Sequence, residues 1–326
     1  MPEVALHCLN PDCGEPVAEG DRFCEVCGQE LLPSVPDLDG AASAAAAQNG
    51  KAPEDPSSGV RRARDRVEMW YPGVAGVSDR GLQRARNEDA IAVLRMEEHD
   101  STVLVVCDGV STSHQAHVAS QVAADTVLGA LVEAVEDGAI DLEESMREAV
   151  VRAQGAVAAI PYRQGAKDPP SSTLVAAVVR GDCATIGWVG DSRAYLVCPS
   201  GTWQLSRDDT WVAEQVAQGL LSESEAAGDP NGHVLTRWLG EDWRDSQAAS
   251  TLSFRVEEPS HLVLCSDGLW NYLPTEQALA DAVAELHETT PLGLAAQLTE
   301  LARQAGGHDN ITVAVAAVDA ASGGGL

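Results

Sequence analysis

The sequence predicts an α+β sandwich preceded by a small cysteine-rich segment. From about residue 69 onward, short β-branched apolar runs of the kind that form buried strands recur along the chain. Longer stretches with regularly spaced apolar residues are typical of amphipathic helices. The order is strands, two helices, many strands, two helices and one strand. Because strands and helices do not alternate strictly, an α+β sandwich fits better than a parallel, Rossmann-like sheet.

Each predicted element has its own signal. The first helix pair is expected over 115–136 and 141–159, where apolar residues recur at helical spacing. A second pair is expected within 275–304, divided at Thr290-Pro291 because proline disfavours helical backbone in the residue before it. The apolar runs predict strands at Val103–Cys107, Leu174–Val179, Ala184–Val189, Leu262–Cys265 and Ile311–Val318.

Composition divides the chain of 326 residues into four parts. Residues 1–32 contain four cysteines and little that could form a core. Residues 33–68 contain four prolines, an alanine-rich run and no aromatic residue, which predicts a flexible linker. Residues 69–320 contain all seven tryptophans and are expected to form the folded domain. Residues 321–326 are expected to be a disordered tail.

The charge balance excludes two classes of partner. Asp and Glu number 50 against 21 Lys and Arg, a net charge of −29. Nucleic acids and anionic membranes are bound by clustered cations, so we expect neither as a partner. The sequence shows no secretory leader and no apolar run of about 18 residues. These observations predict a cytoplasmic protein with reduced cysteines.

The four N-terminal cysteines form two pairs, Cys8 with Cys13 and Cys24 with Cys27. Cys13 and Cys27 are each followed by glycine, which allows the backbone to fold beneath a metal. Four thiolates suit a closed, structural zinc site. Two disulfides or unrelated free thiols are the alternatives. We favour a zinc ribbon over 1–32, and its acidic composition favours a docking or structural role over nucleic-acid binding.

Acidic residues beside glycine or asparagine recur at the ends of the apolar runs. One such residue alone indicates only a turn. Several that converge would repel one another unless cations lay between them, and oxygen ligands suit Mg²⁺ or Mn²⁺ better than zinc. The candidates are Glu88-Asp89, Asp108-Gly109, Asp191, Asp267-Gly268 and Asp309-Asn310.

In this order, the motifs resemble those of the metal-dependent (PPM, type 2C) Ser/Thr protein phosphatases. The resemblance covers about residues 76–318 and implies a β-sandwich of two antiparallel sheets flanked by helix pairs, with a metal site at one end. The matching motifs are Ser78–Gly81, Arg84, Asn87–Asp89, Asp108-Gly109, Ser172-Thr173, Gly190–Arg193, Leu235–Arg237, Cys265–Leu269 and Asp309–Thr312.

The resemblance also implies a role for each site residue. Two Mn²⁺ or Mg²⁺ ions would be bridged by Asp108, and a third, weaker ion is seen in many bacterial members. The remaining assignments are Asp267 and Asp309 on the first ion, Glu88 and the Gly109 carbonyl on the second with Asp89 ordering its waters, and Asp191 on the third. A metal-activated water would then hydrolyse phosphoserine or phosphothreonine, while Arg84 clamps the phosphate.

Phosphorylated proteins and a cognate bacterial Ser/Thr kinase are the implied partners. The sequence departs from the family in Val110–His114, where bacterial members usually have a glycine-rich stretch ending in histidine. His114 could be the proton donor or an ordinary loop histidine. Residues 208–232 are expected to form a flap that selects substrates or serves only structure. A pseudophosphatase or a phosphoprotein-binding adaptor docking through the ribbon is the alternative function.

Overall fold

The structure is a computed structural model that describes residues 6–7, 16–17, 58–162, 165, 168–226, 229–241, 249–286 and 288–320. It divides into two units, Met1–Asp55 and Pro56–Leu326. In the first unit, strands β1 (Leu6–His7) and β2 (Pro16–Val17) form an antiparallel pair. The predicted zinc-binding residues Cys8, Cys13, Cys24 and Cys27 and the predicted tail 321–326 lie outside the described residues.

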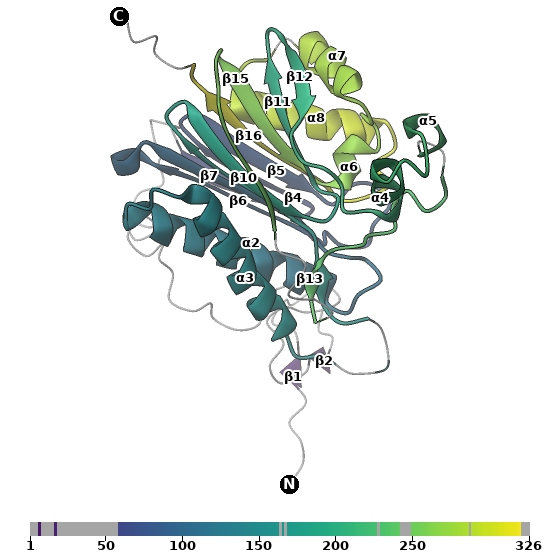
Figure 1. The fold of residues 1–326 in the computed structure, drawn as a ribbon. Coiled ribbons are helices and arrows are strands. Elements are labelled where there is room, and N and C mark those ends of the chain that lie inside the picture. The colour runs from purple at the N-terminus through teal and green to yellow at the C-terminus, as the bar shows by residue number, and fades with distance from the viewer. Residues whose placement is uncertain are drawn as a thin grey trace, which may run out of the picture. The chain divides into compact units, whose positions relative to one another are not determined.

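Two antiparallel sheets form the centre of the second unit, as the sequence predicts (Figure 1). The five-stranded sheet has the order β14 (Ser250–Arg255), β10 (Cys183–Val189), β9 (Leu174–Arg180), β7 (Ser101–Asp108) and β6 (Asp89–Met96). The seven-stranded sheet has the order β12 (Gly201–Gln204), β11 (Arg193–Cys198), β15 (Ser260–Cys265), β16 (Ile311–Val318), β5 (Val74–Asp79), β4 (Arg66–Tyr71) and β3 (Gly59–Ala63). A short pair joins β8 (Ser171–Ser172) to β13 (Leu239–Gly240).

Helices cover the outer faces of both sheets (Figure 1). The five-stranded sheet is covered by α2 (Ala116–Glu136) and α3 (Leu142–Ala158), and the seven-stranded sheet by α6 (Asp267–Trp270), α7 (Glu276–Leu286) and α8 (Pro291–Gln304). Between β12 and β13 lie α4 (Trp211–Ala217) and α5 (Glu223–Ala226), and a 3-10 turn, η1 (Glu97–His99), joins β6 to β7. Helix α8 begins at Pro291, and Thr290 caps it by accepting a hydrogen bond from Gly293 N. This confirms the predicted division of the helical stretch at Thr290-Pro291.

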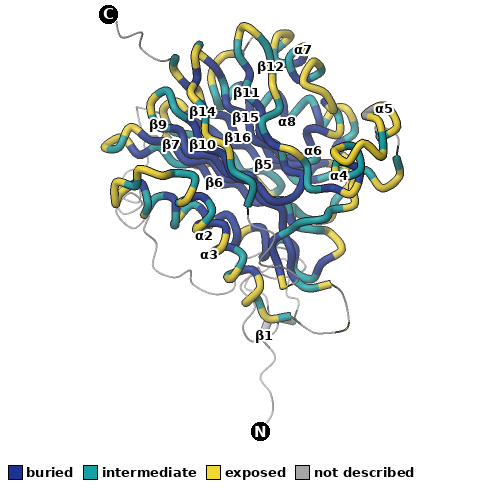
Figure 2. The backbone as a smooth tube through the Cα atoms, in the orientation of Figure 1, coloured by how far each residue is buried: buried dark blue, intermediate teal, exposed yellow. Residues whose placement is uncertain are grey.

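Four layers enclose three apolar cores, seen as the dark central strands of Figure 2. Alternation along β7 shows how one strand serves two of them. Val103, Val105 and Cys107 face the helix pair α2–α3, whereas Leu104 and Val106 face the other sheet. A strand buried on both faces has a continuous apolar sequence, which is why this run was recognisable from the sequence alone.

The predicted linker 33–68 extends too far. Strand β3 and the start of β4 lie within it, so the folded unit begins before residue 69. Strand β3 lies at the edge of the sheet, where its Arg61 pairs with Glu68 of β4, and Arg66 of β4 pairs with Asp79 of β5. Edge strands are held mainly by backbone hydrogen bonds and commonly carry charged residues, so apolar patterning could not reveal β3.

Helix α2 is the one described helix whose length and hydropathy would suffice to cross a membrane. No continuous apolar run of about 18 residues lies in it, in keeping with the prediction from the sequence. Its apolar face accounts for the hydropathy, because Val127, Leu131 and Val135 are fully buried against the five-stranded sheet and α3. A helix buried between a sheet and another helix is apolar for the same physical reason as a membrane helix.

We expect Leu131→Ala to destabilise the folded unit by about 2–5 kcal/mol, because it leaves a cavity under α2. Leu220 is 65% exposed, so Leu220→Ala should change the free energy of unfolding by about 0.5 kcal/mol or less. Urea denaturation followed by circular dichroism measures both. Equal effects of the two substitutions would contradict the packing described for α2.

Candidate functional site

Strand register gathers five acidic residues at one end of the sandwich. Asp108 ends β7 and lies directly opposite Asp89, the first residue of β6. Asp191 occupies the turn between β10 and β11, Asp267 follows β15, and Asp309 precedes β16. Because neighbouring strands in each sheet are antiparallel, the end of one strand adjoins the beginning of the next. Residues far apart in the sequence therefore meet.

Burial makes this cluster electrostatically costly. The pKa of Asp108 is raised well above its usual value by burial, then by Asp89, Asp267, Asp191 and Asp309. Burial and the negative charge of Asp267 likewise raise the pKa of Asp191. The pKa of Asp267 rises to about 6 through burial and Asp309, although His233 and a hydrogen bond with Asp108 oppose this. These carboxylates cannot all be ionised without a compensating positive charge.

Two buried oxygens in the cluster have no hydrogen-bond partner. Asp89 Oδ2 accepts hydrogen bonds from Ser266 Oγ at 2.8 Å and Thr312 Oγ1 at 2.7 Å, but Asp89 Oδ1 and Asp267 Oδ1 accept none. Unpaired buried carboxylate oxygens are ligands that hard cations prefer. The carboxylate oxygens of the cluster therefore fit divalent cations in their chemistry. Their spacing does not yet form a metal site, because among the described residues no three acidic, histidine or cysteine side chains lie close enough together to hold an ion.

Arg84 supplies a positive charge at the edge of the cluster. One terminal nitrogen donates to Asp309 Oδ2 and the other donates to Ser111 Oγ at 3.1 Å. Burial disfavours its charged form, but the hydrogen bond and the attraction to Asp309 outweigh burial and raise the pKa of Arg84. Its side chain is 37% exposed, so the guanidinium is charged and remains accessible from outside.

Backbone contacts hold the loops of the cluster in place. Asn310 Oδ1 accepts a hydrogen bond from Glu88 N at 2.8 Å, and its Nδ2 donates to Arg80 O and Arg86 O. At Gly268 a β-carbon would lie 1.8 Å from Asn310 O, so only glycine allows the Asp267 and Asp309 loops to approach. Gly109 N donates to Glu88 O at 3.1 Å, which joins the two loops that begin β6 and end β7.

The structure also places histidines near the cluster. His114 lies before α2, with its Nδ1 buried and without a hydrogen-bond partner. His117 was not predicted: Arg86 approaches both of its ring nitrogens, at 2.9 and 3.0 Å. Burial and the positive charge of Arg86 lower the pKa of His117 to about 4, so it is neutral at pH 7. The sequence carried no pattern that indicated this pair.

The family pattern for Protein phosphatase 2C matches residues 81–301. The chain belongs to this family. It is 32% identical over 247 residues to the serine/threonine protein phosphatase PstP of Mycobacterium tuberculosis, an alignment that covers 75% of this chain and 44% of PstP. The chain thus spans less than half the length of that relative. A serine/threonine phosphatase stp of Listeria monocytogenes is 28% identical, with 72% of this chain and 92% of that protein covered.

Solved structures agree with this membership of the protein phosphatase 2C family. A crystal structure of PstP/Ppp from M. tuberculosis superposes with a TM-score of 0.63 at 29% identity, covering 76% of this chain and 98% of that one. A second PstP structure, of its catalytic domain in complex with two manganese ions, superposes with a TM-score of 0.61 at 29% identity, covering 76% and 98%. The four-layer sandwich is therefore the protein phosphatase 2C fold.

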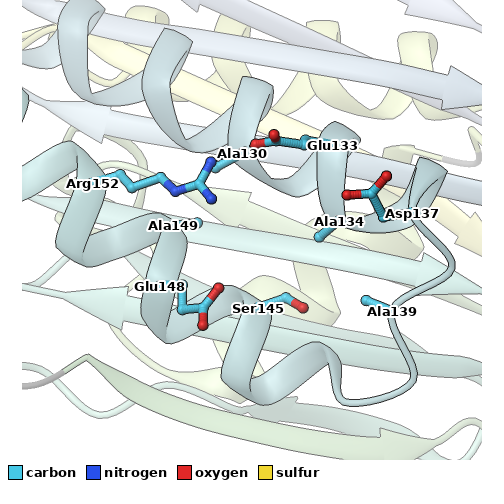
Figure 3. A pocket seen from close by; sticks show the side chains of 9 residues that line it. All are labelled: Ala130, Glu133, Ala134, Asp137, Ala139, Ser145, Glu148, Ala149 and Arg152. Atoms are coloured by element: carbon cyan, nitrogen blue, oxygen red, sulfur yellow. Dashed lines mark hydrogen bonds and ion pairs between the residues drawn. The ribbon is translucent and has the colours of Figure 1, made fainter.

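A shallow hollow of about 230 Å³ is a separate feature of this protein phosphatase 2C (Figure 3). It lies toward the C-terminal end of α2, roughly 25 Å along the helix from Ala116, whose carbonyl lies beside Gly109. Arg152 and Glu133 form an ion pair within it. Its other polar side chains are Asp137, Ser145 and Glu148, and none of the site residues lines it.

We expect Asp89→Asn to stabilise the chelated protein, and more so as pH rises. Burial raises the pKa of Asp89 to about 7, against 3.8 for an unperturbed aspartate. Folded wild type therefore binds more protons than the unfolded chain between these values, and it loses stability as pH increases from about 4 to about 7. Asparagine has no such charge to bury.

Thermal melts in EDTA at pH 5 and pH 8 measure this effect. At pH 8 the Tm of Asp89→Asn should exceed that of wild type by about 3 °C or more, the shift that ~1 kcal/mol produces in a domain of this size. The difference should be smaller at pH 5. Asp137→Asn, which replaces an exposed aspartate at the end of α2, is the matched control and should show neither shift. A Tm difference independent of pH would contradict the assignment.

Proposed function

We propose that this chain hydrolyses phosphoserine and phosphothreonine in proteins in a reaction that requires Mn²⁺ or Mg²⁺. The observation that carries the proposal is the cluster of buried acidic residues, whose charge demands cations and whose position follows from strand register. Membership of the protein phosphatase 2C family and similarity to PstP, whose catalytic domain has been crystallised with two manganese ions, support it.

In this proposal each residue of the cluster has a separate role. Asp108 would be shared by two ions, and Asp267 and Asp309 would complete the ligands of the first. Glu88 and the Gly109 carbonyl would hold the second ion, and Asp89 would order its waters. Asp191 would hold a third ion, which the negative charges of Asp267 and Asp208 beside it favour. When bound, the ions supply Lewis acidity and lower the pKa of water.

Arg84 orients the phosphate of the substrate. A guanidinium can donate two parallel hydrogen bonds to phosphoryl oxygens, and its charge compensates the charge that spreads over these oxygens during transfer. In the structure its two terminal nitrogens contact Asp309 and Ser111. If Asp309 served as a cation ligand, Arg84 would be free to exchange this contact for the phosphate.

The predicted N-terminal domain is a further proposal. We infer that 1–32 is a zinc ribbon with Cys8, Cys13, Cys24 and Cys27 as ligands, joined by a linker to the phosphatase domain. Support comes from the cysteine spacing and from the antiparallel pairing of β1 with β2, because Cys8 and Cys13 lie between these strands in the sequence. The ribbon would bind a protein partner. A cytoplasmic location and an opposing Ser/Thr kinase complete the proposal.

We expect purified protein to hydrolyse p-nitrophenyl phosphate and a phosphothreonine peptide with added Mn²⁺, and to lose this activity in EDTA. Asp108→Ala and Asp267→Asn should each reduce kcat by about 100-fold or more, since Lewis-acid stabilisation contributes several kcal/mol to the barrier. Asp137→Asn is the control and should retain full activity, and circular dichroism checks the fold. Tight phosphopeptide binding without turnover would instead indicate the adaptor function.

The ribbon is tested by metal analysis. We expect one zinc per chain by mass spectrometry after dialysis, because four thiolates bind zinc tightly. Cys24→Ser combined with Cys27→Ser should abolish it. Cys198→Ser, which changes a cysteine in the folded unit, should leave the zinc content unchanged. Zinc that persists in the double variant would contradict the assignment of the ligands.

A further inference from the structure

The flap expected over 208–232 lies in the connection formed by residues 207–226 and 229–238. This connection, called the flap below, is attached at its base to the turn that carries Asp191. Asp209 N donates to Gly190 O at 2.9 Å, and Gly190 N donates to Asp209 Oδ2 at 2.9 Å. The returning chain is fixed to the same point, because Thr236 N donates to Asp209 O at 2.8 Å. The two ends of the flap are therefore bonded to each other, and through Asp209 to the β10–β11 turn.

Arg193 extends this attachment to α6. Its guanidinium donates to both carboxylate oxygens of Asp208 in the flap, at 2.7–3.2 Å. The guanidinium carbon lies 3.8 Å from the centre of the Trp270 ring, which is a cation–π contact. Trp270 Nε1 in turn donates to Asp191 O at 2.9 Å. The Trp270 ring thus joins the flap base, the Asp191 turn and α6.

His233 forms a second contact between the flap and the same ring. Its imidazole stacks on Trp270 with ring centres 5.6 Å apart and an angle of 18° between the planes. Arg193 and His233 both contact the Trp270 ring, and Trp270 is only 7% exposed. Trp270 also lies one helical turn after Asp267 in α6, so the stack brings His233 beside the helix that carries Asp267.

We propose that the stack of His233 on Trp270 anchors the returning segment 229–234 of the flap to the helix that carries Asp267, which makes His233 a positioning residue for reaction with protein substrates. The flap base is held by backbone hydrogen bonds and by Arg193. Segment 229–234 ends on a backbone bond, from Trp211 N to Val234 O at 2.8 Å, but it has exposed residues such as Val234 at 49%, so a side-chain anchor adds to that bond.

This inference rests on the proposed function for its consequence but not for its geometry. A phosphoprotein bound at the site would lie beside the flap, because the flap is bonded to the Asp191 turn and stacks on α6. The small substrate p-nitrophenyl phosphate would make few contacts with the flap. Loss of the anchor should therefore raise KM for a phosphopeptide more than KM for the small substrate. Chemistry at phosphorus would be affected less, because His233 is not assigned to a proton transfer.

The test compares His233→Ala with His233→Phe in the full-length, Mn²⁺-loaded protein. Phenylalanine retains a flat ring that can stack on Trp270, and alanine does not. We expect amide hydrogen exchange in 229–236 to be about 3- to 10-fold faster in His233→Ala, as the loss of one ring stack implies, and close to wild type in His233→Phe. His99→Ala, which changes a histidine at the opposite end of β7 from Asp108, is the control and should match wild type.

Kinetics supply the second measurement. His233→Ala should raise the ratio of KM for the phosphopeptide to KM for p-nitrophenyl phosphate about threefold or more, and His233→Phe should restore this ratio. Unchanged flap exchange in His233→Ala would overturn the proposal. So would a His233→Phe variant that loses activity while its flap exchanges as slowly as wild type, because this would assign His233 to chemistry. If wild type is inactive, the proposed function fails but the exchange result still decides the anchor.

Discussion

Mutual repulsion among buried carboxylates is the constraint on which the rest of this structure depends. Asp191 is buried and Asp89, Asp108 and Asp267 are partly buried, and burial raises the pKa of all four; Asp89, Asp191 and Asp267 each further raise the pKa of Asp108. Such a cluster opposes folding unless positive charge compensates it. The surrounding structure must therefore hold these acidic side chains close together against their repulsion. The paired strands of the two sheets, which carry them, are rigid enough to do so.

The sandwich supplies that rigidity. Each acidic residue lies at or next to a strand end, and each strand is fixed by pairing in a sheet that is buried between two other layers. Asn310 ties the loops before β6 and β16 together, and Gly268 lets the Asp267 loop after β15 approach the Asp309 loop before β16. The flap is attached differently: its base is hydrogen-bonded to the Asp191 turn, and its returning segment is held by a backbone bond from Trp211 N to Val234 O and by a ring stack.

Predictions from the sequence succeeded where a residue's role depends on its immediate neighbours. The five apolar runs correspond to β7, β9, β10, β15 and β16, and the helical patterns to α2, α3, α7 and α8. Edge strand β3 was missed because backbone pairing, and not apolar side chains, holds it. The contacts of His117 with Arg86 and of Trp270 with Arg193 and His233 were also missed, since none follows from a local pattern.

The sequence by itself determined the alternation of apolar and polar residues, the acidic residues at strand ends and the family motifs, because each is written in a few consecutive positions. Only the tertiary structure decided that Asp108 lies opposite Asp89, that Arg84 contacts Asp309 and that Trp270 joins the flap to α6. The physical reason is distance along the chain. Strand register and layer packing act between residues far apart in the sequence, such as Val74 and its strand partner Ala316, and no local propensity encodes them.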